Sequence, residues 1–106
     1  MNPEDVRDVV EQEIRDLATI PSSHGLDVRA CLVVPREIVC RNTFPKLKHG
    51  KALRLWLVLE ETPGRRDGYL IVFDEATALF GLACWDGETP VFIGYHGGFC
   101  DTLRGM

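Results

Sequence analysis

Four apolar runs in the second half of the chain constrain its fold more than any other feature of the sequence. Each run has the length and the period-two spacing of a β-strand, and both of its alternating faces carry apolar residues. The runs cover residues 53–60, 69–73, 79–85 and 91–95. An antiparallel sheet ordinarily buries one face and leaves the other in water. A sheet built from these runs therefore needs a cover on each face.

The N-terminal segment predicts one amphipathic helix. Asn2 suits the N-cap, Pro3 the first helical position, and Asp5 the third position, where a carboxylate favours the positive helix end. Apolar residues then recur at three-to-four spacing as far as Ala18, and Pro21 ends the pattern. One helix covers one face. We therefore expect a protein partner or a second copy of the chain on the other face, unless the sheet curls on itself.

Turn residues between the runs predict antiparallel pairing. The links are short and include Asp67-Gly68 and Asp86-Gly87, whereas parallel strands need crossovers of a dozen residues or more. Residues 26–34 predict a further strand that Pro35 interrupts, with a short continuation at 37–41. The sequence thus predicts a single α+β domain over residues 1–106. It consists of an N-terminal helix packed on an antiparallel meander sheet of five to six strands, with a short C-terminal helical turn.

Composition and cysteine usage narrow the class of protein. The 106 residues are 45% hydrophobic and 26% charged, which is typical of one ordinary folded domain. No apolar run approaches the roughly 20 residues of a membrane helix, and the acidic first residues do not resemble a secretion signal. The four cysteines lie in apolar, strand-like segments, which indicates buried thiols in a reducing compartment. We expect a cytoplasmic protein with no membrane contact and no cofactor.

Charge is segregated along the chain. The net charge is −4, made up of −5 over residues 1–27, +6 over 28–54 and −5 over 55–106. The acidic total disfavours nucleic acid as a partner. The basic block suits an anion or an acidic protein surface at the loop 41–54, although solvated side chains explain it equally well. The anion-binding candidates are Arg41, Lys46, Lys48, His49 and Lys51.

Aromatic and arginine side chains predict a protein interface. Trp, Tyr and Arg are the usual anchors of protein–protein contacts. Aromatic residues on sheet faces also pack in cores, and that alternative stays open. The interface candidates are Trp56, Arg54, Arg65, Arg66 and Trp85.

Signals for catalysis are weak. Cys84, His96 and Cys100 have the residue types of a metal site or a thiol enzyme, but the close Cys-x-x-Cys pair of a strong metal motif is missing. We therefore expect a non-enzymatic protein-binding or regulatory module, acting as a homodimer or as an inhibitor or partner of another protein. The alternatives are a small anion or ligand binder that uses the 41–54 loop, and a small thiol or metal enzyme that uses these three residues.

Overall fold

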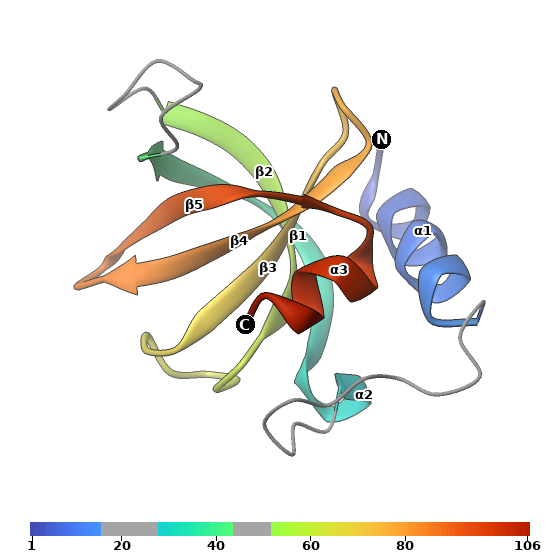
Figure 1. The fold of residues 1–106 in the computed structure, drawn as a ribbon, viewed down its shortest axis with the longest axis horizontal. Coiled ribbons are helices and arrows are strands. Elements are labelled where there is room, and N and C mark those ends of the chain that lie inside the picture. The colour runs from blue at the N-terminus through green and yellow to red at the C-terminus, as the bar shows by residue number, and fades with distance from the viewer. Residues whose placement is uncertain (16–27, 44–51) are drawn as a thin grey trace.

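A computed structural model describes residues 1–15, 28–43 and 52–106 of the chain (Figure 1). All four apolar runs are strands there, each longer than predicted by a residue or two at its ends. The elements in chain order are α1 (Pro3–Arg15), α2 (Val28–Cys31), β1 (Leu32–Asn42), β2 (Ala52–Glu60), β3 (Tyr69–Asp74), β4 (Leu79–Asp86), β5 (Thr89–Gly97) and α3 (Phe99–Arg104).

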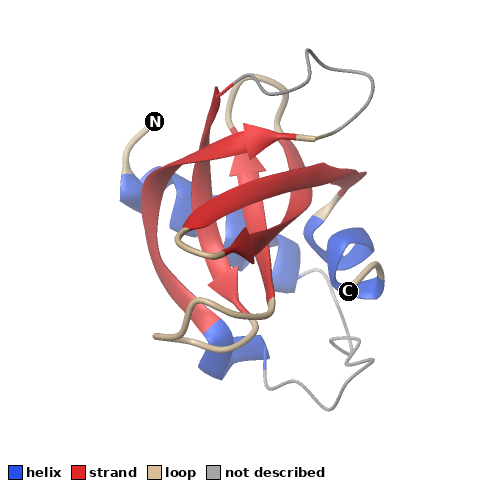
Figure 2. Cartoon of the chain, turned by 90° about the vertical axis from the view of Figure 1, so that its left-hand side faces the viewer, coloured by secondary structure: helices blue, strands red, loops and turns tan. Residues whose placement is uncertain are grey.

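The five strands close into a barrel in the order β1-β2-β3-β4-β5. Consecutive strands pair antiparallel, as the short links predict. The first and fifth strands then run in the same direction, and they close the barrel through a short parallel seam that pairs Arg41 with Val91 and Asn42 with Phe92. The α+β class, the N-terminal helix and the short C-terminal helix are confirmed. The open meander is wrong, because the sheet rolls up until its edges meet (Figure 2).

Closure explains why both faces of the strands are apolar. Along β3, Leu70 and Val72 belong to one hydrophobic cluster, whereas Ile71 and Phe73 belong to another. Helices α1 and α3 contribute only to the second cluster, so the first cluster fills the barrel. We call these two groups the inner cluster and the outer cluster. The inner cluster comprises Cys40, Leu55, Leu57, Leu70, Val72, Ala83 and Phe92.

The chain itself covers the outer cluster. Val6, Val10 and Ile14 of α1 are buried against it, and Phe99 and Leu103 of α3 join them. Figure 1 shows α1 and α3 on the same side of the barrel. Of the two covers considered for the second face, an external partner and curling of the sheet, the closed barrel agrees with curling. A second helix shares the outer face, and curvature buries the inner one.

Bulges and one glycine allow the sheet to bend this tightly. The register shifts within β1/β2, β2/β3 and β4/β5, and such bulges increase local twist and bending. At Gly81, an added Cβ would lie 2.6 Å from the Gly94 carbonyl oxygen and 2.7 Å from the Phe92 ring. Only a residue without a side chain therefore fits where Phe92 crosses the barrel interior.

The first strand differs from its prediction at its start. Residues 28–31 form the short helix α2, so the strand predicted over 26–34 begins only at Leu32, and residues 26 and 27 lie outside the described residues. β1 then continues through Pro35 to Asn42 as one strand. Pro35 is tolerated because residues 33–35 bulge opposite the single residue Val58, where its missing N–H costs no ladder bond.

Both ends of the fold are anchored by side chain to backbone hydrogen bonds. Asn2 Oδ1 accepts the Asp5 N–H at 2.9 Å, and Asp5 Oδ2 accepts the Asn2 N–H at 3.1 Å, so the predicted cap of α1 is confirmed. Glu13 of α1 accepts the Phe99 N–H at 2.9 Å and thereby caps α3. The predicted end of α1 near Ala18 lies outside the described residues.

Candidate functional site

A groove of about 330 Å³ lies at the end of the barrel where β2 and β4 end. The loop that joins β2 to β3 supplies two of its arginines. Val33 and Trp85 line the groove and also pack against the inner cluster, so the groove is the open end of the barrel core. We call it the barrel mouth. It is lined by Val33, Arg36, Glu60, Gly64, Arg65, Arg66 and Trp85.

Trp85 is the unusual residue of the barrel mouth. Its indole nitrogen Nε1 is buried and has no hydrogen-bond partner in the described part of the chain. The Arg66 guanidinium lies over the indole, 5.7 Å from the ring centroid, in cation–π range. Buried Trp N–H groups normally find an acceptor, and one without a partner needs an explanation. An acceptor supplied by a ligand provides one.

Glu60 contributes a buried carboxylate to the lining of the barrel mouth. Its side chain is nearly inaccessible at 8% exposed, and Arg36 Nη2 lies 3.5 Å from its Oε1. The Gly64 N–H donates to its Oε2 at 3.0 Å, from a turn that places Gly64 at φ +80°. A buried carboxylate needs such partners. Glu60 is thus held by Arg36 and the loop backbone.

Within the described residues, the ion pairs of Arg65 and Arg66 are with exposed acids. Arg65 lies 3.4 Å from Asp67, and Arg66 lies 3.2 Å from Glu88. All four side chains are more than half exposed, and pairs of this kind contribute about 0–1 kcal/mol because water competes for both charges. A ligand carboxylate can therefore replace Asp67 or Glu88 at little cost.

The five predicted interface residues do not form one surface. Arg65, Arg66 and Trp85 meet at the barrel mouth. Trp56 instead lies in the outer cluster at 5% exposure, with its Nε1 donating to Glu75 Oε1 at 3.4 Å. Arg54 is 76% exposed on β2 and pairs with Glu37 at 3.4 Å. Trp56 is therefore a core residue, whereas Trp85 remains a candidate interface residue.

The predicted anion-binding loop is described only at its margins. Arg41 Nη2 pairs with Asp86 Oδ2 at 2.8 Å on the surface of the barrel. Lys46, Lys48, His49 and Lys51 lie outside the described residues. Anion binding by this loop stays a prediction.

The predicted thiol and metal residues lie on three different elements, with Cys84 on β4, His96 on β5 and Cys100 on α3. No group of three His, Cys, Asp or Glu in residues 1–15, 28–43 and 52–106 is placed to hold a metal ion. Burial raises the pKa of Cys100 above its usual value and that of Cys40 to about 12. The structure therefore provides no environment that favours the reactive thiolate at either residue.

Sequence reasoning missed Arg36 and Glu60 as members of the site. Arg36 belonged to the basic block but was not singled out, because nothing in the sequence shows that it reaches the end of β2. Glu60 resembled a solvated strand end. The sequence signal for Glu60 was its position as the last residue of an otherwise apolar strand, directly before a turn.

Comparison with protein-family models, with curated proteins and with solved structures finds no match to this chain. Among the described residues, no helix has the length and apolar character needed to cross a membrane. The functional argument therefore rests on the geometry of the barrel mouth.

Proposed function

We propose that this domain is a non-enzymatic protein-binding module that contacts its partner through the barrel mouth. One observation carries the proposal: Arg65, Arg66 and Trp85, which the sequence marks as interface residues, surround a single groove. Trp and Arg are the residue types that most often dominate the energetics of protein interfaces. The unpartnered Trp85 N–H adds a donor that a bound chain can use.

The partner in this proposal is a different protein. A second copy of the chain was expected in order to cover an apolar sheet face. The inner cluster lies within the barrel, and α1 and α3 pack on the outer cluster, so that reason no longer applies. Binding at the barrel mouth would let the domain act as a regulator or inhibitor of the protein that it covers.

Affinity capture with matched variants tests the proposal. The immobilised domain is exposed to an extract of its source cells, in parallel with Arg66→Glu and with Arg104→Glu. Arg66 and Arg104 are 59% and 64% exposed and each pairs with one acid, so the two variants are closely matched. We expect one protein to be retained by the parent and by Arg104→Glu but lost from Arg66→Glu. The same order of affinities should hold when that protein is purified and titrated.

Equal retention by both variants would place the contact elsewhere and overturn the proposal, as would the absence of any specifically retained protein. A dimer mass of the purified domain in sedimentation, lost in Arg66→Glu, would assign the mouth to a second copy and would overturn the choice of a different protein.

A further inference from the structure

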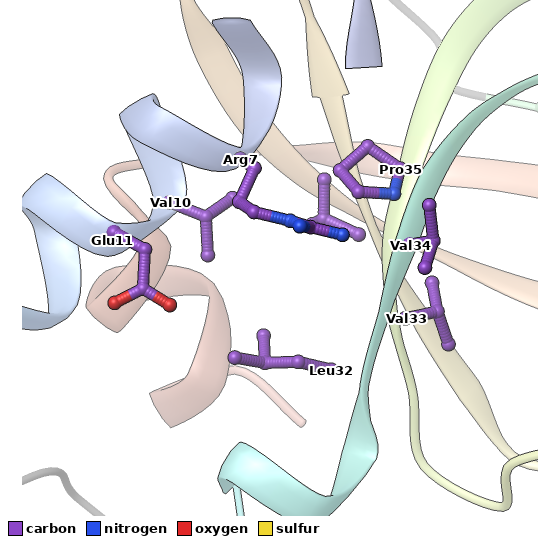
Figure 3. A pocket seen from close by; sticks show the side chains of 8 residues that line it. Arg7, Val10, Glu11, Leu32, Val33, Val34 and Pro35 are labelled. Atoms are coloured by element: carbon purple, nitrogen blue, oxygen red, sulfur yellow. The ribbon is translucent and has the colours of Figure 1, made fainter. Parts of the chain in front are cut away.

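A second groove adjoins the barrel mouth. It measures about 190 Å³ and lies between α1 and β1 (Figure 3). Val10 and Leu32 point into it, and Arg7 extends from α1 toward β1 above them. Val33 lines both this groove and the barrel mouth, so both grooves border the same stretch of β1. We call it the α1–β1 groove.

The bulge in β1 gives the α1–β1 groove its apolar wall. Residues 33–35 lie opposite Val58 alone, and all three line the groove. Val34 remains 67% exposed beside it. Bulges are common beside binding sites, where they re-aim side chains. An aliphatic side chain of a partner would bury Val34 here.

We propose that the two grooves together bind one extended segment of a partner protein in which an acidic residue lies next to an aliphatic residue. The carboxylate binds Arg65 and Arg66 at the barrel mouth, and the aliphatic side chain fills the α1–β1 groove beside Val34. This inference rests on the proposed function and specifies the chemistry of the partner.

Charge complementarity selects an acidic segment. Three guanidinium groups line the barrel mouth against the one carboxylate of Glu60, which Arg36 already engages. Arginine forms bidentate, charge-assisted hydrogen bonds with carboxylates, and these are stronger than its contacts with exposed acids across water. An inorganic anion would satisfy the arginines but leave the aliphatic side chains of the α1–β1 groove uncovered.

Peptide selection tests this inference without knowledge of the natural partner. A library of random peptides displayed on phage is selected against the immobilised domain, and the enriched peptides are synthesised with a fluorescent label. We expect enrichment of Asp or Glu within two or three residues of Leu, Ile or Val. Fluorescence anisotropy should then show that Arg66→Glu and Val34→Glu each weaken binding by about tenfold or more, the loss expected for a charge-assisted contact or a buried aliphatic one. Arg104→Glu should bind as the parent does.

Changes in the peptide separate the two contacts. Replacing its acidic residue by the amide, or its aliphatic residue by Ser, should each weaken binding to the parent domain. Inorganic phosphate serves as the competing small anion. Competition by phosphate, combined with no effect of Val34→Glu or of the Ser peptide, would show a simple anion site and overturn the inference.

Failure of this inference and failure of the proposed function are distinguishable. Enrichment of peptides without acidic residues, or of none, would overturn the inference. If capture of a partner still depended on Arg66 in that case, the protein-binding function would stand with a different chemistry of recognition. If neither acidic-aliphatic peptides nor an Arg66-dependent partner were found, both proposals would be overturned. Circular dichroism of each variant verifies that it is folded before binding is measured.

Discussion

The two ends of the barrel differ in whether their aromatic hydrogen-bond donors have acceptors. At the end where β3 stops, which we call the closed end, Tyr95 Oη donates to Asp74 Oδ2 at 2.6 Å and Trp56 Nε1 donates to Glu75 Oε1 at 3.4 Å. At the barrel mouth, Trp85 Nε1 is buried without an acceptor in the described residues. Both of these donors at the closed end have acceptors, whereas the Trp85 donor at the mouth has none within the described part of the chain.

This difference has a cost that bears on function. Leaving a buried donor unsatisfied costs about 1–3 kcal/mol, which is a large part of the margin of a small domain. The chain shows at Trp56 that it can supply an indole acceptor. Under the proposed function, a bound partner supplies the acceptor that the described residues do not provide for Trp85 Nε1.

Truncating each tryptophan gives the largest contrast between the two ends. Trp56→Ala removes a core side chain and leaves a cavity, so the free energy of unfolding should fall by about 3–5 kcal/mol. Trp85→Ala removes a partly buried ring together with its unpaired donor, and the loss should be about 1–2 kcal/mol. Urea denaturation measures both values. Equal losses would contradict the division of the barrel into a closed end and a mouth.

Removing the Tyr95 hydroxyl tests the closed end alone. Tyr95→Phe should cost about 1 kcal/mol at neutral pH, because the hydrogen bond to Asp74 is lost. Burial, with the hydrogen bond and charge of Asp74, raises the pKa of Tyr95 to about 12. The protonated form is the one that the fold favours, so this contribution is fully present below about pH 10 and is lost as the pH rises toward 12.

Unfolding experiments across that range provide the measurement. The stability difference between the parent and Tyr95→Phe should stay constant up to about pH 10 and shrink from there to pH 12. Other titrating groups should cancel because both proteins carry them. A difference that stays constant through this range would mean that Tyr95 does not titrate in the way that its contact with Asp74 requires.

The strands of this fold were predictable because their signals are local. Residues 69–73 alternate cleanly, and Asp86-Gly87 marks the turn that follows β4. Closure of the barrel was not predictable in the same way. It depends on a parallel seam between Asn42 and Phe92 and on the absence of a side chain at Gly81, which are contacts between residues far apart in the chain.

The candidate site was predictable only in part for the same reason. Arg65, Arg66 and Trp85 carry residue types that suggest an interface wherever they occur. Both tryptophans looked alike in sequence, because each lies in an apolar strand-like run with a charged residue within two positions, Arg54 before Trp56 and Asp86 after Trp85. The two tryptophans differ in their hydrogen bonds: Trp56 Nε1 donates to Glu75, whereas Trp85 Nε1 has no acceptor in residues 1–15, 28–43 and 52–106.

The smallest expected effect on stability concerns the arginines of the barrel mouth. Arg65→Ala should change the free energy of unfolding by less than about 0.5 kcal/mol, since the ion pair of Arg65 is with an exposed acid. Arg66→Ala should change it by about 1 kcal/mol or less, because Arg66 also lies over the Trp85 ring. Arg36→Ala should cost more, because it would leave the carboxylate of Glu60 buried with only the Gly64 N–H as a partner. Thermal unfolding of the three variants compares them directly. A large loss at Arg65 or Arg66 would mean that these residues serve the fold. Near-neutral values are what the proposed role of these arginines in contact with a partner predicts.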